Sequence, residues 1–304
     1  MFHAQPDRPG GHVIPCQTLG RKAGGVSWGS YRSIIQAALS IAAVWPFVFS
    51  AATASHENFS QTDLERLLET GACPGCNLEG APLKNADLRG VNLEGANLRN
   101  ADLKIIDLSE ANLKGTDLRG AEIEKTDLSG ADMTAALLQG ADLEKVDLIG
   151  TNLTDVNLSG ADLENANLSE ARLVGTNLKA ANLRRAILNK TYITNANLDR
   201  ADMERVSMYE AVLANSSLES ANLKRADLRS AKIDGASFRY AILTRITFRD
   251  AEIGHSDFTE ARLGFANLKA AIVVDATGLM QNQLNDACGD QDTQLPERLT
   301  VDPC

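Results

Sequence analysis

Apolar residues recur at every fifth position through most of the chain. From Leu78 to Val273, each fifth residue is Leu, Ile, Met, Phe or Val, which makes 40 consecutive centres without a change of phase. Two residues before each centre stands a small or β-branched residue, and it is Ala in 26 of the 40 cases. Both columns must therefore face one core.

A period of five fits neither regular element. Five residues of α-helix advance by about 500°, so successive centres would spread around the helix axis. Along a strand, centres five residues apart would point to opposite faces. The chain must therefore turn once per repeat, with Asn, Asp, Ser and Gly at the corners. Such internal repetition predicts a solenoid.

The repeat unit resembles that of a known family. Runs such as ANLRN at 96–100 and ADLEN at 161–165 are similar to the A-[DN]-L-x-x unit of pentapeptide repeat proteins, and the similarity covers residues 76–275. The resemblance implies an all-β solenoid, a right-handed quadrilateral β-helix of 20 residues per coil and about ten coils. At an interstrand spacing of about 4.8 Å, ten coils would make a rod of about 48 Å.

Both ends of the repeat region carry signals for a cap. Thr62 to Glu65 forms a capping box that predicts a helix ending at Gly71, within an amino-terminal cap at 55–75. A second short helix is expected from about Gly278 to Cys288, stopped by Gly289. We expect residues 290–304 to lie extended over the last coil, within a carboxyl-terminal cap at 276–304. Closed ends are needed because an open coil would template aggregation.

The amino-terminal segment at 1–54 predicts an exported protein. Basic residues precede an apolar run at 34–49, and the small residues Ala52 and Ala54 follow it. This pattern is typical of a signal peptide at 1–54, cleaved after Ala54, and implies a periplasmic or secreted protein. The alternative is a retained signal anchor in the inner membrane, because 34–54 would span about 31 Å as a helix.

Four cysteines follow the expected cleavage site: Cys73, Cys76, Cys288 and Cys304. The two ends of the expected rod are too far apart for a bridge, so only Cys73 with Cys76 and Cys288 with Cys304 can pair. The same separation excludes a zinc site built from all four. A thiol-redox role for the C-x-x-C motif is less favoured, because Cys76 occupies an inward position and the βαβ context of such enzymes is missing. We expect structural cysteines or disulfides.

The sequence offers little for catalysis or cofactor binding. His255, Ser256 and Asp257 are adjacent in the chain, and a catalytic triad depends on geometry, not on neighbouring types. The chain contains no P-loop, G-x-G-x-x-G or H-E-x-x-H motif. We therefore expect no enzyme activity and no cofactor.

One outward column could attract a hard cation. It contains acidic residues 20 positions apart. They are Asp87, Asp107, Asp127 and Asp147. Turn hydrogen bonding explains this column better, because a short polar side chain can bond to its own turn. We expect no metal site.

Charge is distributed unevenly along the repeats. The whole chain has 30 basic and 40 acidic residues, for a net charge of -10. Residues 76–170 carry 8 basic and 18 acidic residues, or -10, whereas residues 171–275 carry 16 basic and 12 acidic, or +4. One side of the rod concentrates this contrast, and we expect it to orient a partner of complementary charge. Its residues are Asp102, Glu122, Glu124, Asp142, Glu144, Asp162, Glu164, Arg184, Arg185, Arg205, Arg225 and Arg245.

These features predict a non-enzymatic exported scaffold that binds another macromolecule, a protein, through one face of the rod. Repeat rods provide extended surfaces, so no small-molecule substrate is expected and nucleic acid is disfavoured. Membrane association is expected only if 34–54 is retained, and the protein would be a monomer or homodimer. The family resemblance implies an alternative for a cytoplasmic protein, a DNA-mimicking binder of a type II topoisomerase that protects it from quinolones.

Overall fold

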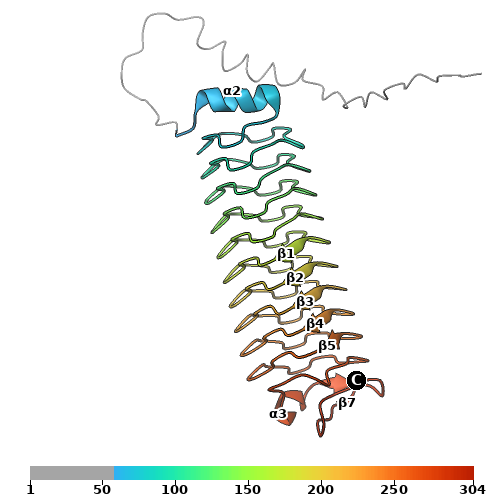
Figure 1. Ribbon diagram of the computed structural model, residues 1–304. Coiled ribbons are helices and arrows are strands. Elements are labelled where there is room, and N and C mark those ends of the chain that lie inside the picture. The colour runs from blue at the N-terminus through green and yellow to red at the C-terminus, as the bar shows by residue number, and fades with distance from the viewer. Residues whose placement is uncertain (1–57) are drawn as a thin grey trace, which may run out of the picture. The chain divides into compact units, whose positions relative to one another are not determined.

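The computed structural model describes residues 58–304, and the expected signal peptide or anchor at 1–54 lies outside the described residues. The described chain is a four-sided parallel β-helix that forms a rod, with helix α2 (Gln61–Thr70) across one end (Figure 1). Among residues 58–304, no helix is long and apolar enough to cross a membrane.

The coils stack in one constant register. Parallel bridges join Ala72 to Asn92 at one end and continue with the same spacing to Asp257 with Thr277 at the other. At this spacing, the segment 76–275 makes ten coils. The sequence-based expectation of a β-helix with about ten coils is confirmed.

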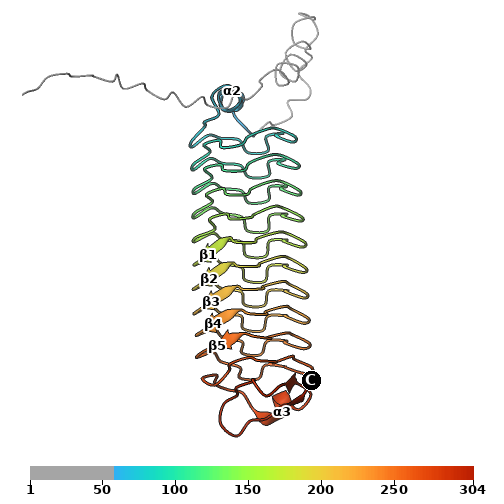
Figure 2. The same cartoon turned by 90° about the vertical axis from the view of Figure 1, so that its right-hand side faces the viewer.

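Most bridges are single residues, but one side of the later coils forms longer strands (Figure 2). These strands pair in chain order as a five-stranded parallel sheet. They are β1 (Arg172–Val174), β2 (Tyr192–Thr194), β3 (Val212–Ala214), β4 (Lys232–Asp234) and β5 (Glu252–Ile253).

The core consists of the two inward columns. All 40 centres from Leu78 to Val273 are buried, and the small residues two positions earlier are buried too, with Ala86 partly so. Phe238 and Phe258 stack in the later coils, with ring centroids 5.0 Å apart, and Phe248 packs edge-on against both. Uniform Leu and Ala columns allow identical coils to stack because the space inside each coil is the same.

Nearly every corner of a coil has a residue with positive φ two positions after the centre; the exceptions are His255 and Asp275. Gly160 has a φ of 66° and Asn165 a φ of 59°. The turn is then closed by a backbone hydrogen bond, as when Ala166 N donates to Leu163 O at 3.0 Å. Glycine and asparagine suit these corners because they adopt the left-handed region at low cost.

Two corners of the β1–β5 side are closed differently. The amide of Ala196 donates to Ser216 Oγ at 3.1 Å, and the amide of Ala236 donates to Ser256 Oγ at 3.2 Å. Both hydroxyls come from the next coil and are buried. At these two corners a serine hydroxyl therefore replaces the carbonyl that accepts the corresponding amide at most other corners.

The amino-terminal cap begins earlier than expected. The N-cap of α2 is Ser60, whose side chain accepts a hydrogen bond from Asp63 N at 3.2 Å. The predicted capping box at Thr62 was therefore wrong by two residues. Ser60 N also donates to Asn77 O at 2.8 Å, so contact with the first coil sets the start of the helix. The helix ends at Gly71, with a φ of 65°, as expected.

The carboxyl-terminal cap has less helix than expected. Helix α3 covers Gln281–Leu284, not Gly278 to Cys288, and Gly289 lies in a strand. The amide of Cys288 donates to Ala266 O at 2.9 Å, because the last coil offers unpaired backbone groups that the chain satisfies by extending. Strand β6 (Cys288–Gly289) then pairs with β7 (Asp302–Pro303), which lays the tail against the coil.

Candidate functional site

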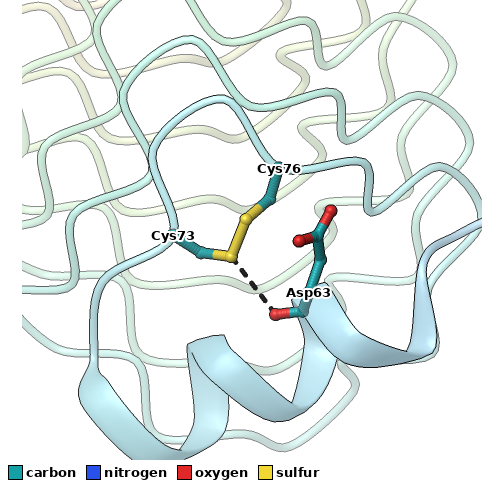
Figure 3. A group of neighbouring side chains, drawn as sticks. All are labelled: Asp63, Cys73 and Cys76. Carbon is teal, nitrogen blue, oxygen red and sulfur yellow. Dashed lines mark hydrogen bonds between the residues drawn. A yellow bond between two sulfur atoms is a disulfide. The ribbon is translucent and has the colours of Figure 1, made fainter.

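The cysteine pair lies at the junction of α2 and the first coil. Cys73 and Cys76 form a disulfide and are almost completely buried, at 0% and 1% exposure (Figure 3). Cys73 Sγ lies 3.2 Å from the carbonyl oxygen of Asp63 in α2. The helix therefore covers the disulfide and packs directly against it.

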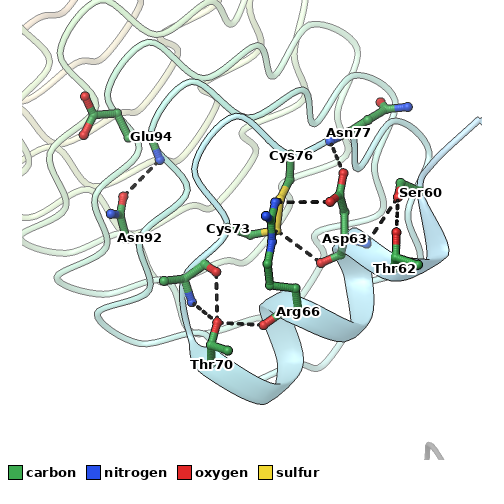
Figure 4. Close-up of a disulfide and its surroundings, with 11 residues drawn as sticks. Ser60, Thr62, Asp63, Arg66, Thr70, Cys73, Cys76, Asn77, Asn92 and Glu94 are labelled. Carbon is green, nitrogen blue, oxygen red and sulfur yellow. Dashed lines mark hydrogen bonds and ion pairs between the residues drawn. A yellow bond between two sulfur atoms is a disulfide. The ribbon is translucent and has the colours of Figure 1, made fainter.

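Two charged side chains of α2 surround this disulfide. The Nε of Arg66 lies 3.2 Å from Cys73 Sγ, and its Nη2 contacts Cys76 Sγ (Figure 4). Arg66 also forms an ion pair of 3.1 Å with one carboxylate oxygen of Asp63. The other oxygen accepts a hydrogen bond from Asn77 N at 3.0 Å. The Asp63 carboxylate is thus held beside the sulfurs from two directions.

Sequence reasoning did not bring Asp63 to this site. It treated Asp63 as part of a helix cap and the two cysteines as structural cysteines or a local disulfide. The structure brings their ligand atoms together, all within 4.8 Å of one another. An acidic residue in the first turn of a short helix that precedes a C-x-x-C motif is the signal that could have found it.

The second disulfide joins Cys288 to Cys304, with an S–S distance of 2.04 Å. It ties β6 to the end of the chain, next to the pairing of β6 with β7. The two cysteine pairs therefore lie one in each cap of the rod.

The side of the rod that concentrates the charge contrast is called the charged face, with an acidic half from Asp102 to Glu164 and a basic half from Arg184 to Arg245. The aspartates of its acidic half are largely hydrogen-bonded within their own turns. The carboxylates of Asp102, Asp142 and Asp162 accept hydrogen bonds from backbone amides two residues later, at 3.2, 3.1 and 3.0 Å. Each therefore stabilises its own corner. Short polar side chains commonly take this role in turns.

Three glutamates of the same half pair with lysines. Lys104 pairs with Glu122, Lys125 with Glu124, and Lys145 with Glu144. The hydrogen bond from Lys125 holds the pKa of Glu124 below its usual value. The hydrogen bonds of Lys104 to Glu122 and Lys145 to Glu144 raise the pKa of each lysine. The acidic half is therefore partly neutralised on the rod itself.

The basic half is less neutralised. Arg184 contacts Asp202 at 3.4 Å and Glu204 at 3.3 Å, and Arg185 lies 3.6 Å from Glu164. Among residues 58–304, Arg205 and Arg225 have no ion-pair partner within 4.0 Å. The Arg245 guanidinium stacks over the exposed ring of Phe265, 5.6 Å from its centroid.

Four of these arginines stand one above another at the same corner of successive coils. We call them the arginine edge: Arg185, Arg205, Arg225 and Arg245. All are exposed, and all have positive φ, from 55° to 61°. Each amide donates to a carbonyl of the next coil at 2.9–3.0 Å. The edge is therefore a straight column of cations on a backbone fixed by the coil register.

The adjacent His255, Ser256 and Asp257 do not converge. His255 Nδ1 bonds to Asp234 at 3.0 Å on the surface, while Ser256 is buried with its hydroxyl on Ala236 N. Asp257 instead pairs with Arg239 at 3.2 Å. The three side chains lie in different environments and form no relay.

The outward column of aspartates 20 positions apart, from Asp87 to Asp147, also forms hydrogen bonds within its own turns. Its carboxylates accept backbone hydrogen bonds from the residues two positions later. The distances are 3.4 Å at Asp87, 2.9 Å at Asp107, 2.9 Å at Asp127 and 3.1 Å at Asp147. Turn chemistry accounts for these residues.

A shallow groove of about 350 Å³ lies over the later strands. Its lining combines apolar residues of β3 to β5 with Lys232, Asp234 and Glu252. The groove is open to solvent, whereas small-molecule sites usually form in enclosed pockets. Its lining also lacks a cluster of catalytic side chains.

Comparison with solved structures finds proteins that are similar to this chain. HetL, a pentapeptide repeat protein involved in heterocyst differentiation regulation from the cyanobacterium Nostoc sp. strain PCC 7120, is 28% identical, covers 72% of this chain and 92% of its own, and has a TM-score of 0.33. QnrB1, a plasmid-mediated fluoroquinolone resistance protein, is 16% identical over 66% of this chain and 92% of its own, with a TM-score of 0.36. No curated protein matches the chain.

The repeats also match the model of a protein family. The description "Pentapeptide repeats (8 copies)" matches residues 75–104, 106–140, 131–169, 166–205 and 207–245. These segments cover more than half of the chain and have the five-residue period that the buried centres follow in the structure. The chain belongs to the pentapeptide repeat family.

Proposed function

We propose that this protein is a non-enzymatic exported scaffold that binds an acidic protein surface through the arginine edge. The observation that carries the proposal is the contrast within the charged face. Its carboxylates are engaged by turns and lysines, whereas Arg205 and Arg225 have no ion-pair partner within residues 58–304. The basic column is therefore the part of the face with unused charge.

The edge is organised before any partner arrives. One arginine per coil gives backbone positions about 4.8 Å apart, because neighbouring coils stack at the interstrand distance. Hydrogen bonds between coils fix these positions, so binding would not require the backbone to order. Guanidinium groups are suited to this role because they are weakly hydrated and can bind carboxylates with two parallel hydrogen bonds.

Repulsion along the edge is a cost that a partner would relieve. Like charges on successive coils repel, although solvent weakens each exposed interaction. An acidic partner would offset this repulsion along several coils at once. Such complementarity mainly raises the association rate and sets the register of the complex.

Export is part of this proposal and has its own test. The motivating observation is the basic flank, apolar run and small-residue site before Ser55. Mass spectrometry of the protein from its native cell should find an amino terminus at Ser55. An intact chain beginning at Met1 in the cytoplasm would contradict export and favour the topoisomerase-binding alternative.

Binding through the edge is tested by charge reversal. The full chain carrying Arg185→Glu, Arg205→Glu and Arg225→Glu should bind a labelled polyglutamate peptide at least about tenfold more weakly at low salt. The loss should shrink at high salt, because exposed charges are screened. Cross-linking in cells with the same variants would then show whether captured partners depend on the edge.

A matched control separates the edge from net charge. Lys179, Arg200 and Lys232 are exposed basic residues of the same half that lie outside the edge. Their triple reversal to Glu changes the net charge by the same amount and should leave binding nearly unchanged. Equal losses in the two triple variants would show that only net charge matters, and would overturn the proposed site. A duplex DNA probe in parallel tests whether the edge selects nucleic acid instead.

A further inference from the structure

Three metal-ligating side chains meet beneath α2. The ligand atoms of Asp63, Cys73 and Cys76 lie within 4.8 Å of one another. Asp63 comes from the first turn of the helix, and the cysteines flank the turn that enters the first coil (Figure 3). The helix and the coil thus contribute to one cluster that neither could form alone.

The donor set has the chemistry of a thiophilic metal site. Two cysteines at C-x-x-C spacing and a carboxylate are ligands that Zn²⁺ uses, and thiolates favour such ions over Mg²⁺ or Ca²⁺. Gly75 makes the turn between the cysteines, with a φ of 68°. The Cα atoms of the two cysteines are 5.5 Å apart, so side-chain rotation alone can separate the sulfurs to the roughly 3.8 Å that two zinc–sulfur bonds require.

We propose that, when the Cys73–Cys76 disulfide is reduced, Asp63, Cys73 and Cys76 bind one thiophilic divalent cation of the Zn²⁺ class, with water as the fourth ligand. Reduction breaks the S–S bond, and the disulfide takes two electrons and two protons from a dithiol reductant, which becomes a disulfide. The metal then displaces one proton from each thiol. Two thiolates and one carboxylate remain around the ion.

Arg66 is placed to support the bound state. Two thiolates, a carboxylate and a divalent cation carry a net charge of -1, and the Arg66 guanidinium lies against both sulfurs and the Asp63 carboxylate. A neighbouring guanidinium also favours thiolates over thiols, which lowers the proton cost of binding. With its side chain 51% exposed, Arg66 has room to swing aside from the ligand atoms.

This site would make the amino-terminal cap stable in two redox states. In the oxidised protein the disulfide links the cysteines, and in the reduced protein the metal would link them to each other and to α2. The inference differs from the sequence-based expectation of no metal, which considered the cysteines without Asp63. It is independent of the arginine edge and of export.

Cobalt binding to the full chain gives a direct test. A background with Cys16→Ser, Cys288→Ser and Cys304→Ser leaves Cys73 and Cys76 as the chain's cysteines. This protein, reduced with a phosphine that does not compete as a thiol, should bind one equivalent of Co²⁺. It should show a sulfur-to-cobalt charge-transfer band and the intense visible bands of tetrahedral Co²⁺. Zn²⁺ should displace the cobalt, and the unreduced protein should bind neither ion.

Variants of the ligands identify the site. Cys73→Ser with Cys76→Ser should abolish the charge-transfer band. Asp63→Asn keeps an oxygen for the hydrogen bond from Asn77 N, and should weaken Zn²⁺ binding by at least about tenfold. Arg66→Gln should weaken it by about 10–100-fold without changing the spectrum, as expected for a group outside the ligand set.

Several outcomes would overturn the inference. One is a reduced protein whose circular dichroism shows intact β structure but which binds no stoichiometric Co²⁺. Another is unchanged affinity in Asp63→Asn, which would remove the carboxylate from the site. Resistance of the disulfide to the phosphine in the folded protein, verified by thiol counting, would also contradict it.

Discussion

The two halves of the rod share a core and differ on the outside. Residues 76–170 carry a net charge of -10 and residues 171–275 one of +4, yet their inward columns are buried alike. At two corners beside β1–β5, the later half also replaces the turn-closing carbonyl with a serine hydroxyl. Packing inside a coil restricts the inward residues, whereas the outward residues face solvent and are free to differ.

The caps repeat this contrast at the two ends. The amino-terminal cap is a ten-residue helix beside a disulfide that spans three residues of sequence, and the carboxyl-terminal cap is a strand pair beside one that spans 16. Both cover an open coil. Different local structures can therefore meet the same need to satisfy the end of a stack of coils.

Removing each disulfide should lower the free energy of unfolding by a different amount at the two caps. Cys288→Ala with Cys304→Ala should destabilise the protein by about 3 kcal/mol, because a longer loop gains more freedom on unfolding. Cys73→Ala with Cys76→Ala should cost about 2 kcal/mol for its shorter loop. Chemical denaturation under oxidising conditions measures both. A larger loss at the amino-terminal cap would reverse the expected order.

Overpacking the core should affect both halves equally. Ala161→Leu and Ala221→Leu place larger side chains at fully buried positions and should each cost about 1–3 kcal/mol. The outward controls are Glu164→Leu and Lys224→Leu, which avoid the positive-φ corners and should change stability little. Urea denaturation midpoints check this. A strong difference between Ala161→Leu and Ala221→Leu would show that the two halves do not share one core.

The serine-closed corners should be sensitive in a way that other corners are not. Ser216→Ala would leave the buried amide of Ala196 without its acceptor and should cost about 1–2 kcal/mol. In the control, Thr151→Val, the amide of residue 151 keeps its bond to Leu148 O, so the loss should be smaller. Thermal or urea denaturation compares the pair. Equal losses would mean that the hydroxyl does not matter specifically at the β1–β5 side.

The smallest expected effect is a pH dependence in the later half. The hydrogen bond and charge of Asp234 raise the pKa of His255 above its usual value. The pKa of His255 is therefore higher in the folded protein than in the unfolded chain. The ion pair stabilises the fold fully at pH values below the pKa of His255 in the unfolded chain, and this stabilisation is lost as pH rises through its pKa in the folded protein. Asp234→Asn should therefore lower stability slightly at about pH 5 and not at about pH 8.5. NMR titration of His255 should show a lower pKa in the variant, and an unchanged pKa would contradict the pairing.

The five-residue period determined a solenoid, its inward columns and its corners, and the resemblance of the repeat unit to the pentapeptide repeat family added the four-sided β-helix. The reason is that every coil must place a Leu-type residue and a small residue inward, so each of the 40 centres carries the same steric information. Positive φ at the corners follows from the same period, and even arginines adopt it there.

Only the tertiary structure decided what lies at the ends and which charges remain unpaired. Ser60 became the N-cap because Asn77 holds its amide, and α3 stopped at Leu284 because the last coil's backbone required an extended partner. Asp63 reached the cysteines because α2 folds back over the first coil. Contacts of this kind depend on one particular neighbour, and a repeating pattern carries no information about them. The same holds for the arginine edge, because the number of its arginines without an ion-pair partner depends on which acidic side chains lie next to each of them.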